Sequence, residues 1–257
     1  MIDASVDIWV AHLDEVGGEL ERLRGLLDGA EVERAARFRS EAARRRFTAR
    51  HGIRRLLLAS YLNEPPQDIV VLQGDGRKPQ IRGPQRGGLA FNESASDELA
   101  VFALARGVEL GIDVERIRPV PDAAGIVARF GSAAEAASYR LVPERDRDVA
   151  FLRWWTAKEA FVKMIGTGLD YPLDAFSVSF PLLEEAPTLP CPRGKSRDPD
   201  DNGSPASGGG DHERCFSLTE LTPAAGYVGT LVVAGGPRRI RQCRWTPDGP
   251  IDARGAA

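Results

Sequence analysis

The strongest constraint on the fold is a short alternation in residues 111–115, which read Gly-Ile-Asp-Val-Glu. Apolar Ile112 and Val114 alternate with acidic Asp113 and Glu115, and this predicts a strand over 110–115. Side chains two residues apart on a strand share a face, so both carboxylates point the same way. Two such acids are usually just solvated, and their meaning depends on what packs against them.

A second stretch, residues 155–163, has a helical repeat. Trp155, Glu159 and Lys163 are spaced by four, so they lie on one face of a helix. If this helix meets the strand, three carboxylates converge beside one ammonium group. Hard divalent cations prefer such oxygen ligands, and phosphates are attracted by the cation and the lysine. The alternative is a surface Glu–Lys pair worth about 0.3 kcal/mol. The apolar residues around the pair favour function, because charges in such surroundings are costly unless they bind something.

Composition excludes several classes of protein. The 257 residues are 42% hydrophobic and 28% charged, which is ordinary for a soluble globular protein. No apolar run approaches about 18 residues, so we expect no transmembrane helix. Early acids and the lack of a basic segment argue against a signal peptide. Three scattered cysteines suggest neither a disulfide framework nor a thiolate metal site, and the cytoplasm is the expected compartment. A net charge of −3 argues against nucleic-acid binding.

Helical and strand patterns are mixed without regular alternation, which predicts the α+β class. We expect helices over 19–27, 31–62 with a bend near Ser40, 122–130, 132–141 and 151–165. We expect strands over 6–13, 69–72, 98–105, 110–115, 176–180, 215–221 and 227–234. A boundary near residue 110 divides the chain into lobes of residues 1–110 and 111–247. Within the second lobe, residues 184–212 read as a long loop or disordered insertion, and residues 248–257 as a loose tail.

The first lobe carries two basic segments. Between Arg34 and Arg55 there are nine arginines and only one acid, Glu41, which indicates either a solvated helix face or an anion-binding surface. Residues 76–79, Gly-Arg-Lys-Pro, are a glycine turn with two cations or an ordinary charged hairpin tip. Asn92 and Ser94 are candidate donors to a phosphate or sugar, or simple turn formers. We single out Arg34, Arg46 and Lys78 among the cations because of the resemblance described below.

No nucleophile presents itself in the sequence. There is no Gly-x-Ser-x-Gly elbow, no cysteine with an obvious partner histidine, and no phosphate-binding or dinucleotide-binding glycine motif. The residues therefore indicate a divalent metal with a phosphorylated ligand, and a nucleophile that a substrate brings.

The two stretches together resemble the signature pair of the 4′-phosphopantetheinyl transferases, and more closely the Sfp-type subgroup. The resemblance extends to the Gly-Arg-Lys-Pro turn at 76–79, to Phe-Asn-Glu-Ser at 91–94, and to residues 166–169 and 176–178, which follow the helix. It runs from about residue 33 to residue 180, and weakly to residue 234. Either motif alone is weak evidence for the family. Both motifs in this order, together with the flanking segments, are specific for it.

The resemblance implies two similar α+β lobes related by a pseudo-twofold axis, with coenzyme A between them. It implies Mg²⁺-dependent transfer of the 4′-phosphopantetheine group of coenzyme A to a serine of an acyl or peptidyl carrier protein, with release of 3′,5′-ADP. Such carriers serve polyketide, non-ribosomal peptide or fatty-acid synthesis. The implied metal ligands are Asp113, Glu115 and Glu159. Glu159 is also the implied base for the serine, and Lys163 contacts the phosphates. The implied coenzyme A contacts are Arg34, Arg46, Lys78, Asn92, Ser94, Asp113 and Lys163.

One departure from the pattern affects the coenzyme A contacts. The family segment usually ends in histidine, whereas this chain has Ala95. Arg77 or a residue of the arginine segment is the expected replacement for that phosphate contact. Two other functions stay open at this point: a non-catalytic module that binds coenzyme A or a carrier, and a metal-dependent pyrophosphate hydrolase. We expect a monomer.

Overall fold

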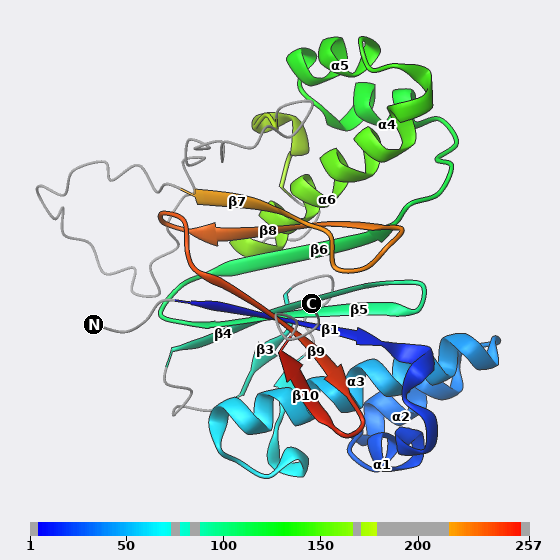
Figure 1. Ribbon diagram of the computed structural model, residues 1–257, viewed down its shortest axis with the longest axis vertical. Coiled ribbons are helices and arrows are strands. Elements are labelled where there is room, and N and C mark those ends of the chain that lie inside the picture. The colour runs from blue at the N-terminus through cyan, green and yellow to red at the C-terminus, as the bar shows by residue number, and fades with distance from the viewer. Residues whose placement is uncertain (1–4, 73–77, 83–87, 167–170, 179–215, 253–257) are drawn as a thin grey trace, which may run out of the picture.

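The computed structural model describes residues 5–72, 78–82, 88–166, 171–178 and 216–252. Two β-sheets lie next to each other between two groups of helices (Figure 1). The N-terminal helices cover the outer side of one sheet, and the helices that follow residue 122 cover the outer side of the other. This arrangement confirms the α+β class. No helix in the described ranges is long and apolar enough to cross a membrane.

The larger sheet joins the two ends of the chain. Its strands are β1 (Val6–His12), β4 (Leu89–Ser96), β5 (Leu99–Arg106), β9 (Ile240–Thr246) and β10 (Gly249–Asp252). Their spatial order is β10-β9-β1-β5-β4. Strands β1, β5 and β4 are antiparallel neighbours, whereas β9 runs parallel to β1. Parallel neighbours need a long crossover, and here most of the chain separates them.

The smaller sheet carries the predicted strand of the first motif at its edge. It consists of β6 (Leu110–Arg116), β7 (Phe216–Leu221) and β8 (Tyr227–Ala234) in the order β6-β8-β7. Its outer side is covered by α6 (Arg147–Ile165), with α4 (Ala123–Phe130) and α5 (Ala133–Arg140) beyond it. Helix α6 contains the second motif and ends at Gly166, whose φ of 75° gives a glycine C-cap.

The N-terminal helices bend where the sequence predicts. They are α1 (Leu20–Arg24), α2 (Gly29–Ala36) and α3 (Glu41–Leu62), with a short β2 (Val71–Leu72) and β3 (Gln80–Ile81) pair after them. The Ser40 hydroxyl accepts a hydrogen bond from the Ala43 N–H at 3.3 Å and caps α3. Short 3-10 helices span Leu13–Glu15, Gly17–Glu19, Pro66–Asp68, Glu144–Asp146 and Leu173–Ala175.

A buried apolar layer holds the two sheets together. It contains alternate residues of β1, β5, β6 and β8, including Ile8, Val101, Ile112 and Leu231. The other faces of the sheets pack against α3 and α6 in two separate cores. Because β6 buries its even-numbered residues against the larger sheet, Asp113 and its neighbours on the odd-numbered face turn toward α6.

The strands differ from expectation at two places. Residues 176–178 form no strand, because Phe176 and Val178 pack into the α6 core and the Val178 N–H bonds Glu135 Oε1 at 2.6 Å. Strand β4 was not expected, because its polar residues hide the alternation. Residues 179–215 lie outside the described ranges, so the insertion at 184–212 stays a prediction.

The C-terminal end of the chain also differs from expectation. The tail from residue 248 is not loose over Gly249–Asp252, which pairs with β9 after a turn in which Gly249 has φ 117°. Residues 240–246, for which no strand was expected, form β9, which pairs with β1 of the larger sheet, and Arg241 binds Asp7 at 2.6 and 2.7 Å. The lobe boundary near residue 110 and the pseudo-twofold relation stay predictions.

The C-terminal part of the arginine segment is structural. Arg54 and Arg55 of α3 are buried and bind Glu31 of α2, and His51 Nδ1 lies 2.9 Å from Glu31 Oε1. Burial alone would raise the pKa of Glu31, but hydrogen bonds from His51, the Asp28 backbone and Arg55 outweigh it and lower the pKa to about 2.

We expect Glu31→Gln to lower the free energy of unfolding at pH 7 by about 3 kcal/mol, because it leaves buried arginines without their carboxylate. The stabilisation from a carboxylate with a lowered pKa is complete above its ordinary value of 4.5 and is lost as the pH falls toward 2. The difference in the free energy of unfolding between wild type and Glu31→Gln, measured by urea unfolding, should therefore become smaller below pH 4.5. Glu33→Gln, on the exposed side of the same helix, is the control. An equal effect of both variants would contradict the role of the buried network.

Candidate active site between the two sheets

Gly111 allows α6 to lie directly on β6. A Cβ atom at this position would lie 2.1 Å from the Ala160 carbonyl oxygen and 2.4 Å from the Met164 nitrogen. Both are backbone atoms of the helix, so a side chain could not be accommodated by a rotamer change. The glycine of the first motif therefore sets the distance between the two motifs.

This close contact brings the two motifs together at Asp113. Lys163 Nζ donates to Asp113 Oδ1 at 2.7 Å, and Ser94 Oγ of β4 donates to the same oxygen at 2.7 Å. Asp113 is 6% exposed, and burial raises the pKa of its carboxyl group against the opposing effect of Lys163. Residues from β4, β6 and α6 thus meet at one carboxylate.

Glu115 is held in a similar way one step along the strand. Ser96 Oγ of β4 donates to Glu115 Oε2 at 2.8 Å, and Arg118 Nη1 donates to the same oxygen at 2.9 Å. Among the described residues, no hydrogen bond reaches Glu115 Oε1 or Asp113 Oδ2. Each carboxylate is therefore anchored through one oxygen and presents the other.

Glu159 of α6 lies within electrostatic reach of both strand carboxylates. Burial raises the pKa of its carboxyl group, and repulsion from Asp113 and Glu115 raises it further, whereas Lys163 opposes the shift. Mutual repulsion of this kind indicates a deficit of positive charge. In the described ranges, however, no three Asp, Glu, His or Cys side chains are grouped closely enough to hold a metal ion. The charged side chains therefore converge, but the described residues do not form a ready three-ligand metal cluster.

Side chains from β4 and from the segment before β3 cover the free edge of β6. Asn92 Oδ1 accepts from the Ile112 N–H at 2.9 Å, and Lys78 Nζ donates to the Leu110 carbonyl oxygen at 2.9 Å. Unpaired strand edges need such partners when they are buried. Asn92, expected at coenzyme A, is thus occupied with the backbone of the neighbouring sheet.

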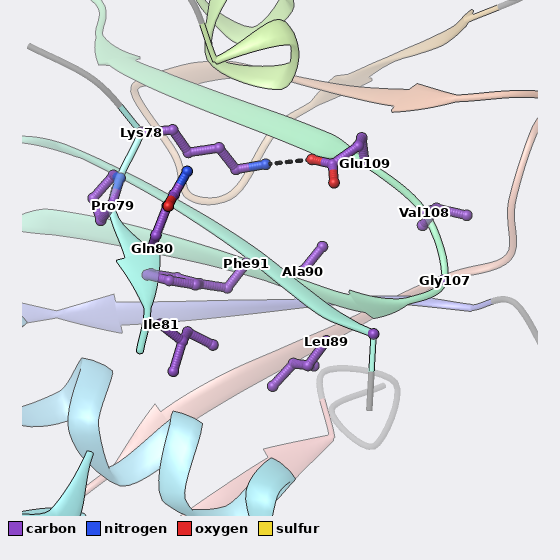
Figure 2. Close-up of a pocket in the computed structure, with 11 residues that line it drawn as sticks. Lys78, Pro79, Gln80, Ile81, Leu89, Ala90, Phe91, Gly107, Val108 and Glu109 are labelled. Carbon is purple, nitrogen blue, oxygen red and sulfur yellow. Dashed lines mark hydrogen bonds and ion pairs between the residues drawn. The ribbon is translucent and has the colours of Figure 1, made fainter. Parts of the chain in front are cut away.

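Lys78 also lines a cavity of about 490 Å³, shown in Figure 2. Its ammonium lies 3.1 Å from Glu109 Oε2 at the rim, and Phe91, Leu89 and Ile81 form apolar walls. The cavity offers one cation and an apolar surface. Asp113, Glu115 and Glu159, which together form the acidic cluster, do not line this cavity. The described contacts of Lys78 go to Glu109 and to the Leu110 carbonyl oxygen, not to the acidic cluster.

A second cavity, of about 340 Å³, contains the position of the expected histidine. Ala95 lines it together with Arg46, Arg50 and Phe47. Arg46 also binds Asp14 at 2.9 and 2.6 Å, and the guanidinium carbon of Arg34 lies 5.7 Å from the centre of the Phe47 ring. Of the two predicted cations, Arg46 therefore lines this cavity, and Arg34 lies against the Phe47 ring that also lines it. Arg77 lies outside the described residues.

The sequence did not single out several residues of this region. Ser96 and Arg118 hold Glu115, and Glu109 holds Lys78. For Ser96 the signal was available, because it continues the two-residue spacing of Asn92 and Ser94 on β4.

Lys158 of the second motif has a structural role. It is fully buried, and its ammonium binds Glu135 at 2.8 Å and the Leu173 carbonyl oxygen at 2.8 Å. Glu135 also accepts from Trp154 Nε1 at 2.9 Å. This network fixes α6 against α5 and leaves Glu159 and Lys163 on the partly exposed face.

Comparison with known proteins identifies the family. A family model described as the 4′-phosphopantetheinyl transferase superfamily matches residues 109–198, which contain both motifs. The 4′-phosphopantetheinyl transferase HetI of Nostoc sp. is 33% identical over 237 residues, which are 91% of this chain and 90% of HetI. The chain belongs to the 4′-phosphopantetheinyl transferase superfamily.

Two further relatives support the Sfp-type resemblance. The 4′-phosphopantetheinyl transferase psf-1 of Bacillus pumilus is 32% identical over 62% of this chain and 66% of its own length. The 4′-phosphopantetheinyl transferase Sfp of Bacillus subtilis is 29% identical over 62% of this chain and 69% of its own length. Membership of a transferase superfamily agrees with the enzyme class expected from the sequence.

We expect Gly111→Ala to separate α6 from β6 and to break the contact between Lys163 and Asp113. The backbone clash should lower the free energy of unfolding by about 1–3 kcal/mol, the usual result of overpacking. Urea unfolding followed by tryptophan fluorescence measures this. Gly18→Ala is the control, because a Cβ there meets nothing within 4 Å. A Gly111→Ala protein as stable as the control would contradict the role given to Gly111.

Proposed function

We propose that the protein transfers the 4′-phosphopantetheine group of coenzyme A to a serine of an apo acyl or peptidyl carrier protein in a Mg²⁺-dependent reaction. The serine oxygen forms a bond to phosphorus, the pyrophosphate P–O bond breaks, and 3′,5′-ADP leaves. The carriers serve polyketide, non-ribosomal peptide or fatty-acid synthesis.

One observation carries this proposal: a buried carboxylate, Asp113, is bonded to Lys163 and to Ser94 while Glu159 is repelled by it. Acids and a lysine kept together in a partly buried place are suited to binding a phosphate through a cation. The absence of a nucleophile from the sequence motifs agrees with a serine that the partner supplies.

Each residue has a distinct task in this reaction. Glu159 accepts the serine proton, directly or through a water molecule, and its raised pKa makes it a stronger base than an ordinary glutamate. Lys163 lies where it can exchange its contact with Asp113 for a phosphate oxygen and stabilise the charge that develops. Phosphoryl-type transfer depends mainly on such positioning and charge neutralisation.

Asp113, Glu115 and Glu159 are the residues that would hold Mg²⁺. Their chemistry fits, since all three offer carboxylate oxygens, two of them have an oxygen to which no described residue donates, and Glu159 is under electrostatic repulsion. When bound, the ion would neutralise charge on the pyrophosphate of coenzyme A. Side-chain rotation would be needed to complete the set, because the described residues form no ready cluster.

Coenzyme A would lie along the first lobe. Lys78 would contact it from the cavity of Figure 2, and Ser94 and Asn92 lie at the adjoining strand edge. Arg46, with Arg34 nearby, lines the cavity at Ala95. Arg50 lines the same cavity, which supports the arginine segment as the replacement for the missing histidine.

The proposal is tested by intact-mass analysis of a panel of apo carrier proteins incubated with the protein, coenzyme A and Mg²⁺. We expect a mass gain of one phosphopantetheine group per carrier and no reaction in EDTA. Cleavage of coenzyme A without a carrier would indicate a hydrolase instead. Binding of coenzyme A with neither reaction would indicate a non-catalytic module.

In the same assay, Asp113→Asn and Glu159→Gln should each slow carrier modification by about 100-fold or more, because a charged ligand or the base is lost. Glu144→Gln, at an exposed glutamate outside both motifs, is the control. Undiminished transfer by both variants would refute the assignment of these carboxylates.

The monomeric state and the cytoplasmic location stay predictions. Light scattering tests the monomeric state.

A further inference from the structure

The hydroxyl of Ser96 connects the two sheets at Glu115. It accepts a hydrogen bond from the Arg116 N–H at 3.1 Å and donates to Glu115 Oε2 at 2.8 Å. A serine hydroxyl has a single proton. Because the backbone N–H already occupies the oxygen as a donor, the hydroxyl proton is directed at the carboxylate.

The same carboxylate oxygen receives a second donor. Arg118 Nη1 lies 2.9 Å from Glu115 Oε2. Two donors on one oxygen fix the rotation of the carboxylate plane, and in the described part of the chain no hydrogen bond reaches Oε1. Arg118 is half exposed, whereas Ser96 is partly exposed and lies on strand β4.

The arrangement repeats that of the neighbouring pair. Ser94 donates to Asp113 Oδ1, just as Ser96 donates to Glu115 Oε2. Ser94 lies two residues before Ser96 on β4, and Asp113 lies two residues before Glu115 on β6. Side chains of two strands meet in this way when their two-residue repeats are in register. The spacing of two serines on the first sheet therefore matches the spacing of two acids on the second.

We propose that Ser96 is a positioning residue that orients Glu115 as a ligand of the divalent cation, and that it does so across the contact between the two sheets. This inference rests on the proposed function, because it takes Glu115 as one of the metal ligands. A group that donates a hydrogen bond to a metal-ligating carboxylate fixes the orientation of that carboxylate. Loss of such a group typically weakens metal binding by about 10–100-fold.

The decisive comparison is between Ser96→Thr and Ser96→Val, which have nearly the same shape and differ in the hydroxyl. Both are β-branched residues that suit a strand, so both should fold. We expect Ser96→Val to raise the Kd for Mn²⁺ by about 10–100-fold and Ser96→Thr to restore it to near the wild-type value. Electron paramagnetic resonance of Mn²⁺ in the presence of coenzyme A, without a carrier, gives the Kd.

A second measurement separates positioning from a general loss of structure. The Mg²⁺ concentration for half-maximal carrier modification should rise in Ser96→Val, while the rate at saturating Mg²⁺ falls much less. Ser60→Ala is the control, because the Ser60 hydroxyl bonds only the Leu57 carbonyl oxygen of its own helix among the described residues. Wild-type Mn²⁺ affinity in Ser96→Val would overturn the inference.

Failure of the inference and failure of the proposed function give different results. If the wild type modifies carriers but Mn²⁺ binding is the same in the Thr and Val variants, Ser96 does not position Glu115 and the transferase function stands. If Mn²⁺ binding depends on the hydroxyl but no carrier is modified, the positioning role holds and the proposed function fails.

Discussion

The site depends on the direct contact of α6 with β6, which exists because residue 111 has no side chain. A Cβ atom there would lie 2.1 Å from a carbonyl oxygen of the helix. With the contact made, Lys163 reaches Asp113 at 2.7 Å, and Glu159 comes close enough to be affected by the charge of the same aspartate. The glycine is therefore as much a part of the site as the charged residues, although it does no chemistry.

The edge between the two sheets is the second constraint. The sheets share an apolar layer, but at β4 and β6 they are joined by side-chain hydrogen bonds from Asn92, Ser94 and Ser96. A polar contact of this kind satisfies the free edge of β6 and at the same time fixes the direction of two carboxylates. The residues that join the two sheets are thus also the residues that hold the carboxylates of the proposed site. Asn92 has the structural part of this role, because it accepts a hydrogen bond from the Ile112 N–H.

The buried charges elsewhere have a structural meaning. The Glu31 network joins α2 to α3, and the Glu135–Lys158 pair joins α5 to α6, the helix that carries Glu159 and Lys163. Their charges are paired and hydrogen-bonded, which is the condition for burying them. The acidic cluster of Asp113, Glu115 and Glu159 differs, because burial and then repulsion from the other two carboxylates raise the pKa of Glu159.

The sequence by itself determined the α+β class, the strand and helix of the two motifs, and which side chains share a face, because those depend on periods of two and about four residues. It also determined the family resemblance. Only the tertiary structure decided that β9 lies beside β1, that Lys158 is structural, that Arg46 lies at the Ala95 cavity, and that Ser96 and Arg118 share one oxygen of Glu115. These are contacts between residues far apart in the chain or choices between single atoms, and local pattern carries no information about either.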